Sequence, residues 1–279
     1  MQPGLDFPLY IDNNANAFLL AAFHKFGGAP CAVVVLFTGD EEIGSPEGRP
    51  VIEAEACRAR VVFNREGGRL SGNIVTRRKG AVFSKFTITG KAAHSGSKFS
   101  DGVSAIEELA HKTLAIHALT DLDRGITLNV GLAGGGQSVN TVAPSAEGQI
   151  DLRYIDPGDR DEVMTQIGAI VGHSYVAGTK AELIVRGEFL PLVPNDSARK
   201  LLDLYIAAAA DSGFATSGEF DGGCADSGFA AAAGAPTICS IGPIGRKVHS
   251  ADEFLLLDSL LPRVQASART ILRLEESGL

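Results

Sequence analysis

The segment of residues 31–45, CAVVVLFTGDEEIGS, constrains the fold more than any other part of the chain. Residues 32–36 are apolar and rich in valine but too few for an independent helix, so they predict a strand buried on both faces. Three carboxylates, Asp40, Glu41 and Glu42, follow this strand after a glycine. Ligands of open α/β sheets bind outside the carboxyl ends of the strands, so the acidic turn is predicted to lie at a ligand crevice.

The acidic turn also predicts a metal site. Like charges at the mouth of a buried strand repel one another and lose hydration unless cations lie among them. Neighbouring side chains in turning backbone point in different directions, so one of Glu41 and Glu42 can bind an ion while the other reaches a water on that ion. A solvated acidic turn is the alternative interpretation.

Two later segments add further candidate ligands. The predicted strand at residues 60–64 is followed by Glu66, whose alternative role is a salt bridge to Arg65 or Arg69. His249 follows a glycine-rich connection after another buried strand. Neutral imidazole and carboxylates form the ligand set that zinc takes in hydrolytic sites, although His249 could also be a surface histidine.

The middle of the chain has a different pattern. Residues 81–89 alternate apolar and polar side chains, as a half-exposed antiparallel strand does. The elements expected up to residue 186 follow the order β-α-β-β-α-β, which is typical of a ferredoxin-like α+β unit. We therefore predict an α/β chain in which residues 79–187 form an inserted domain, while residues 1–78 and 188–279 form the main domain. A helix is predicted over residues 12–26.

Composition restricts the partners and the compartment. The net charge of −8 argues against nucleic acid. No apolar run reaches the roughly 18 residues of a membrane span, and no basic-then-apolar leader opens the chain. The four cysteines lack CxxC spacing, which argues against a disulfide framework and against a thiolate zinc site. We expect a cytoplasmic protein without membrane contact.

Six motifs point to a known family. The segments LFTGDEEIGS, ITGKAAHSG, GGQSVNTVAP, DLRY, GGCADSGFAAAAGAPT and KVHSADE occur in this order. Together they resemble the co-catalytic zinc aminoacylase and carboxypeptidase family, which includes glutamate carboxypeptidase, acetylornithine deacetylase, succinyl-diaminopimelate desuccinylase and aminoacylase. The resemblance implies a zinc-peptidase-like mixed sheet flanked by helices, interrupted by a lid domain that joins two subunits into a homodimer.

The resemblance also implies roles for residues of the zinc site. Glu41 would be the general base, Glu42 a ligand of one zinc ion and Glu66 a ligand of the other. His249 would be the distal zinc ligand. His94 would reach into the partner's site and steady the oxyanion.

The same resemblance implies a substrate-binding set. Asn140 and Arg153 would hold the carboxylate of the substrate, and Gly223 and Asp226 in the GGCAD loop would line the pocket. From the residues alone, His94 is either a solvated loop residue or a substrate contact. Arg153 could instead form an ordinary cross-strand ion pair.

The amino-terminal part departs from the family pattern. No His-x-Asp segment occurs before Gly39, so one zinc histidine is missing. Asp12 is the first candidate for the metal-bridging carboxylate, and Asp6 is the second. The chain is therefore either a truncated or divergent zinc-dependent hydrolase of small N-acyl amino acids or peptides, or a non-catalytic dimeric ligand-binding or scaffold protein.

Overall fold

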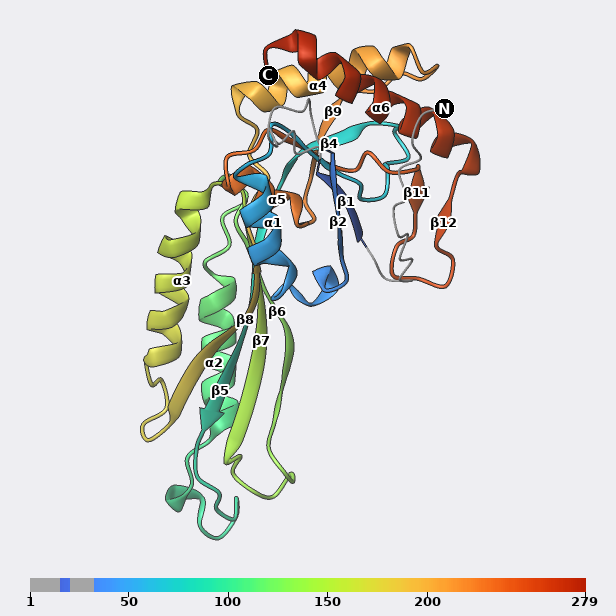
Figure 1. Ribbon diagram of the computed structural model, residues 1–279. Helices are drawn as coiled ribbons and strands as arrows, with labels where there is room; N and C mark the ends of the chain where they lie inside the picture. The colour runs from blue at the N-terminus through green and yellow to red at the C-terminus, as the bar shows by residue number, and fades with distance from the viewer. Residues whose placement is uncertain (1–15, 21–32) are drawn as a thin grey trace. The chain divides into compact units, whose positions relative to one another are not determined.

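The computed structural model describes residues 16–20 and 33–279, which belong to two compact units (Figure 1). The first unit comprises Met1–Thr76, Pro194–Glu219 and Ala233–Leu279. The second comprises Arg77–Val193 and Phe220–Ala232. The predicted lid domain, residues 79–187, falls within this second unit.

The first unit contains a mixed four-stranded sheet in the order β10-β3-β1-β2. Its strands are β1 (Asn16–Leu20), β2 (Val34–Thr38), β3 (Val62–Asn64) and β10 (Thr237–Ile238). Its helices are α1 (Gly48–Ala56), α4 (Asp196–Ala210) and α6 (Leu260–Ser277). Strand β3 runs parallel to β10 and antiparallel to β1. Phe63 of β3 packs with Tyr205 of α4 and Ala266 of α6, so one apolar core joins the sheet to both helices.

Two predictions for this unit are wrong. Residues 16–20 form a strand rather than part of a helix, and this strand pairs with both β2 and β3. A short apolar run fits either structure, and sheet pairing decides in favour of the strand. Strand β2 is not buried on both faces, because it is the last strand in its sheet order and its Val35 and Phe37 are 48% and 49% exposed.

The second unit contains an antiparallel sheet in the order β6-β7-β5-β8. Its strands are β5 (Gly80–Thr89), β6 (Thr127–Gly135), β7 (Ser145–Tyr154) and β8 (Lys180–Phe189). Helices α2 (Ala105–His117) and α3 (Pro157–Gly172) run alongside these strands in Figure 1. Alternate residues of β5 and β7, such as Phe86 and Ile150, pack with both helices in one core. The order β-α-β-β-α-β confirms the predicted ferredoxin-like unit.

Local side-chain contacts define where the lid helices begin. The Ser104 hydroxyl accepts a hydrogen bond from the Glu107 amide (3.2 Å) at the start of α2. The Asp156 carboxylate accepts one from the Gly158 amide (2.8 Å) at the start of α3, where Pro157 is the first helical residue. Such caps satisfy amides that have no partner inside the helix.

The remaining elements are short. They are β4 (Ile74–Arg78), β9 (Gly218–Asp221), α5 (Ser227–Ala232), β11 (Gly245–Arg246), β12 (Phe254–Leu255) and three 3₁₀ turns at Glu41–Ile43, Phe99–Asp101 and Leu257–Ser259. Strand β4 pairs with β9, and β11 pairs with β12. None of the helices in the described ranges has the length and apolarity needed to cross a membrane.

Candidate functional site

The acidic turn follows β2 and continues into α1. Glu41 and Glu42 lie in a 3₁₀ turn, and Asp40 precedes it. The Asp40 carboxylate accepts hydrogen bonds from the amides of Glu47 (2.7 Å) and Gly48 (2.9 Å) at the start of α1. Backbone donors therefore stabilise the negative charge of this carboxylate.

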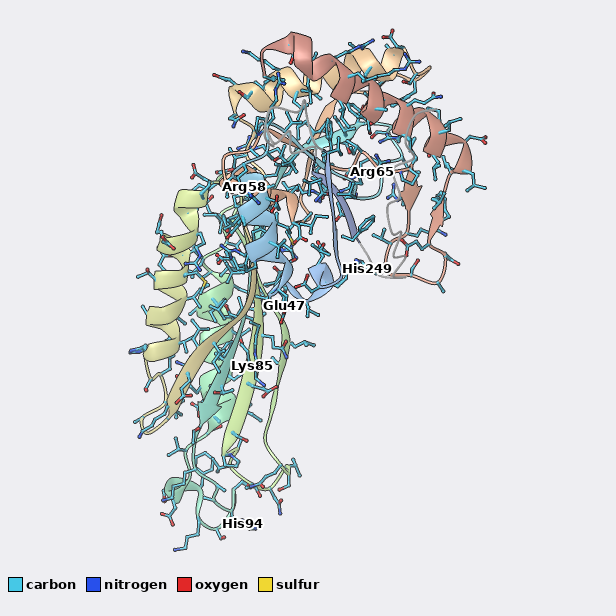
Figure 2. All side chains as sticks on the ribbon, in the orientation of Figure 1. Glu47, Arg58, Arg65, Lys85, His94 and His249 are labelled. Carbon is cyan, nitrogen blue, oxygen red and sulfur yellow. The ribbon has the colours of Figure 1, made fainter. Side chains whose placement is uncertain are left out.

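The structure brings Glu42 close to His249. His249 lies in the connection between β11 and β12, where Figure 2 labels it. Its Nε2 atom is 3.8 Å from Glu42 Oε2, and the two side chains are 71% and 68% exposed. The φ angle of His249 is +64°, a left-handed conformation that is uncommon for a residue with a side chain. Two candidate metal ligands from distant parts of the chain thus meet at the surface of the first unit.

The turn that carries Glu66 is hydrogen-bonded to the segment that precedes β11. The Gly242 amide donates to the Glu66 carbonyl (3.0 Å), and the Gly68 amide donates to the Pro243 carbonyl (2.8 Å). A Cβ atom on Gly68 would lie 2.6 Å from the Gly242 carbonyl oxygen, so the two backbones approach as only glycine allows. Hydrogen bonds therefore tie the Glu66 turn to the segment that leads to His249.

The described residues bring two of the predicted zinc ligands close together. Atoms that share a tetrahedral zinc ion lie about 3.4 Å apart, so the separation of Glu42 Oε2 and His249 Nε2 needs only a small adjustment. Catalytic zinc sites usually have three protein ligands, however, and no group of three or more His, Cys, Asp or Glu side chains within residues 16–20 and 33–279 is arranged to hold a metal ion. Asp12 and Asp6 lie outside the described residues. The pair fits zinc chemistry, but the described set of ligands is incomplete.

His94 and Asn140 are neighbours at one end of the lid sheet. The Ser95 amide donates to the Asn140 carbonyl (3.0 Å), and His94 pairs with Thr141 in an antiparallel bridge. His94 Nδ1 accepts a hydrogen bond from the Gly96 amide (3.1 Å), so the neutral ring carries its hydrogen on Nε2. Figure 2 shows His94 beyond the carboxyl-terminal end of β5, the strand that contains Lys85. The exposed ring can therefore donate a hydrogen bond from Nε2.

Arg153 lies near the opposite end of the same sheet. It is opposite Ala81 at the start of β5, whereas Ser145 at the other end of β7 is opposite Thr89. Eight residue steps separate Ser145 from Arg153, which corresponds to about 26 Å of strand. One chain therefore cannot bring Asn140 and Arg153 to the same carboxylate.

Three side chains surround the Arg153 guanidinium. Its Nε donates to Asp151 Oδ1 (2.7 Å), its Nη1 donates to Cys224 Sγ (3.3 Å), and its carbon lies 5.2 Å from the centroid of the Phe83 ring. Burial lowers the pKa of Arg153, but the hydrogen bond to Asp151 and the charges of Cys224 and Asp151 outweigh burial, so the pKa is raised overall. The ion pair of Arg153 is thus with Asp151 on its own strand, not across strands.

The GGCAD loop lies in the second unit, between β9 and α5. The Gly223 amide donates to Asp221 Oδ1 (2.6 Å), and the Gly223 carbonyl accepts a hydrogen bond from Arg78 Nη1 (3.3 Å). Asp226 is fully buried. These contacts fix the loop that carries Cys224, which is a thiol and not part of a disulfide.

Sequence reasoning assigned no individual role to Asp40, Asp151 or Cys224, although Asp40 belongs to the acidic turn and Cys224 to the GGCAD loop. The signal for Asp151 was available, because residues two apart on a strand point to the same face and Asp151 lies two residues before Arg153. The contact of Cys224 with Arg153 joins parts of the chain that only the fold brings together.

Comparisons with known proteins agree with the fold. The sequence profile described as a peptidase dimerisation domain matches residues 76–179. Carboxypeptidase G2 of Pseudomonas sp. is 28% identical over 246 residues, which cover 87% of this chain and 59% of the relative. Acetylornithine deacetylase of Myxococcus xanthus is 30% identical over 169 residues, which cover 55% of this chain and 43% of the relative. These matches confirm the predicted resemblance to the zinc aminoacylase and carboxypeptidase family.

Solved structures share this fold. Aminopeptidase PepT from Bacillus cereus superposes with a TM-score of 0.67 at 21% identity. The superposed region covers 90% of this chain and 66% of the PepT chain. The aminobenzoyl-glutamate utilization protein from Klebsiella pneumoniae has a TM-score of 0.66 at 20% identity, covering 87% and 62%. These findings confirm the predicted resemblance and the predicted fold class. It spans about half of the length of the curated relatives it matches.

Proposed function

We propose that the chain is a zinc-dependent amidohydrolase that releases an amino acid or acyl group from a small N-acyl amino acid or peptide. The observation that carries this proposal is the approach of Glu42 and His249 to 3.8 Å from distant parts of the sequence. The names of the relatives, a carboxypeptidase and a deacetylase, support amide hydrolysis as the reaction class.

The residues of the first unit divide into metal ligands and a base. Glu42, Glu66 and His249 would hold zinc, with Asp12 as the candidate bridging carboxylate. Zinc, when bound, lowers the pKa of water and polarises the substrate carbonyl. Glu41 adjoins Glu42 in the same 3₁₀ turn and is partly exposed, so its carboxylate can take the proton of the attacking water and pass it to the departing amine.

The lid residues would act in two groups. Arg153 can bind a substrate carboxylate, because a guanidinium fork matches the two oxygens of that group. His94 lies beyond the opposite end of the sheet, about 26 Å or more along β7 from Arg153. His94 and Asn140 at a substrate held by Arg153 must therefore come from a second chain. We propose a homodimer in which His94 donates from Nε2 to the oxyanion of the partner's substrate.

Metal analysis tests the hydrolase proposal. The purified protein should bind about two zinc ions per chain, and chelators should abolish hydrolysis of a panel of N-acyl amino acids and glutamate-terminated dipeptides. The variant Glu41→Ala should lose turnover but keep its metal, because a base that is not a ligand can be removed without emptying the site. Absence of zinc together with absence of chelator-sensitive hydrolysis would refute the proposal.

Mixing two inactive variants tests the dimer. If His94 acts in the partner's site, Glu41→Gln and His94→Asn chains that exchange freely should form hybrid dimers with one intact site. About a quarter of the wild-type activity should return, since half of the dimers are hybrids and each has one working site of two. If a mixture shown to contain hybrid dimers recovers no activity, then His94 does not act in the site of the partner.

A non-catalytic ligand-binding or scaffold protein is the second candidate function. The observation that favours it is that the described residues bring together two candidate ligands rather than three. A dimer that binds small carboxylates but neither zinc nor an amide substrate productively would support this second function.

A further inference from the structure

The guanidinium of Arg153 is held on several sides yet keeps donors for a ligand. Nε donates a hydrogen bond to Asp151, Nη1 donates one to Cys224, and the guanidinium carbon lies 5.2 Å from the centroid of the Phe83 ring. Nη2 of Arg153 donates no hydrogen bond to any of the described residues. The side chain is 23% exposed, so solvent reaches the group. Three of the five N–H bonds of an arginine fork therefore stay available for a ligand.

The position of the Cys224 thiol is fixed independently of Arg153. The preceding residue, Gly223, is bound through its amide to Asp221 and through its carbonyl to Arg78. Arg78 is only 5% exposed and also lies 3.7 Å from Asp221. The ion pair of Arg78 and Asp221 thus holds the backbone next to Cys224, whose sulfur accepts the hydrogen bond from Arg153.

We propose that Cys224 and Asp151 are positioning residues that orient Arg153, so that a ligand carboxylate binds its remaining N–H groups with the Cys224 sulfur beside that carboxylate. The inference rests on the proposed function in one respect, which is that the ligand is the carboxylate of an amide substrate. Two fixed contacts on one planar cation limit its rotation, so less conformational freedom is lost when the carboxylate binds.

Two alkylating reagents can test this arrangement. Iodoacetate and iodoacetamide present the same CH₂–I group, but only iodoacetate carries a carboxylate. In each reaction the cysteine sulfur forms a bond to the CH₂ carbon, the C–I bond breaks, iodide leaves and the thiol proton goes to solvent. A carboxylate bound by Arg153 should hold the CH₂ group of iodoacetate near Cys224.

The measurement compares rates at two cysteines of the full-length chain by peptide mass spectrometry. Cys57 is the internal control, because it is exposed and its sulfur donates a hydrogen bond to the Ala54 carbonyl (3.1 Å) rather than to a cation. The rate ratio of iodoacetate to iodoacetamide should be about tenfold higher at Cys224 than at Cys57. A factor of about ten is the gain in affinity expected from one charge-assisted hydrogen bond. Free glutamate should slow alkylation at Cys224 and leave Cys57 unaffected.

Variants separate positioning from simple exposure of the thiol. Arg153→Gln should reduce the Cys224 ratio to that of Cys57, and Arg153→Lys should retain part of it because the charge remains. Asp151→Asn should lower the ratio several-fold while Arg153 stays in place. In hydrolysis assays, Cys224→Ala should raise KM for a carboxylate-bearing substrate several-fold with little change in kcat, and Cys224→Ser should restore KM.

Two results would overturn the inference. One is an equal reagent ratio at Cys224 and Cys57 in the wild-type protein, and the other is a preference for iodoacetate that survives Arg153→Gln. Alkylation requires neither metal nor turnover. A protein with the preference but without hydrolysis would therefore refute the proposed function alone, whereas an active enzyme without the preference would refute this inference alone.

Discussion

An ion pair buried in the second unit offers a demanding test of the structure. Lys112 Nζ lies 2.7 Å from Glu108 Oε1, and the two side chains are 1% and 0% exposed. Lys112 also donates to the carbonyls of Ile170 (3.0 Å) and Val171 (2.9 Å) at the end of α3, and to the carbonyl of His173 beyond it. One ammonium group therefore joins α2 to the carboxyl end of α3.

The variant Lys112→Met removes this cation while keeping a chain of similar length. Glu108 would be left as a buried carboxylate without its cation, and the carbonyls at the end of α3 would lose a donor. Removal of one partner from a buried ion pair costs about 3–5 kcal/mol. The matched control is Lys85→Met, because Lys85 is 2.6 Å from Glu147 but the two side chains are 21% and 50% exposed. An exposed pair contributes about 1 kcal/mol or less.

Urea unfolding and hydrogen exchange measure the effect. The amides of Tyr175 (3.2 Å) and Val176 (2.6 Å) donate to the Glu108 carboxylate, so their exchange rates report on the network directly. Exchange at both amides should accelerate strongly in Lys112→Met and little in Lys85→Met. A loss of stability below about 1 kcal/mol in Lys112→Met, equal to that of the control, would refute the reasoning.

Three further predictions follow from the same structure. Burial raises the pKa of Glu108, but the hydrogen bonds from Lys112 and two backbone amides outweigh burial and lower the pKa below 4.5. The wild-type protein should therefore be more stable than Glu108→Gln at neutral pH, and this difference should disappear as the pH falls below 4.5. A difference that stays constant down to pH 2 would contradict this. Asp40→Ala should lower the free energy of unfolding by about 1 kcal/mol in urea titrations, since two amides at the start of α1 lose their acceptor, whereas Asp40→Asn should recover most of it. Gly228→Ala should destabilise the second unit by more than about 2 kcal/mol, because its Cβ would lie 1.8 Å from the Leu190 carbonyl oxygen, and an unchanged thermal midpoint would contradict that close approach.

The lid could be predicted from the sequence because its elements are long and regular. Strands β5 and β7 each have ten residues, and alternation over such a length has one interpretation. The prediction for residues 16–20 was wrong for the opposite reason, because this segment is short. Four apolar residues in a row fit a helix or a strand, and only the pairing with β2 and β3 decides between them.

The candidate site was predictable only in part. Glu42 and His249 stood out because each follows a predicted strand, and the structure brings them together. The amide partners of Asp40 and the Cys224 partner of Arg153 could not be predicted, because amides at a helix start and a cysteine 71 residues away become neighbours only after folding. The roles assigned to these residues stay predictions until the experiments above are done.

The close packing of Gly68 against Gly242 has a consequence for engineering and for divergence. Since neither position has room for a side chain, the spacing between the Glu66 turn and the segment leading to His249 cannot be adjusted by small changes at the crossing point. Any gradual change in the position of His249 relative to the Glu66 turn must therefore arise nearer the tip of the connection, where the chain is exposed.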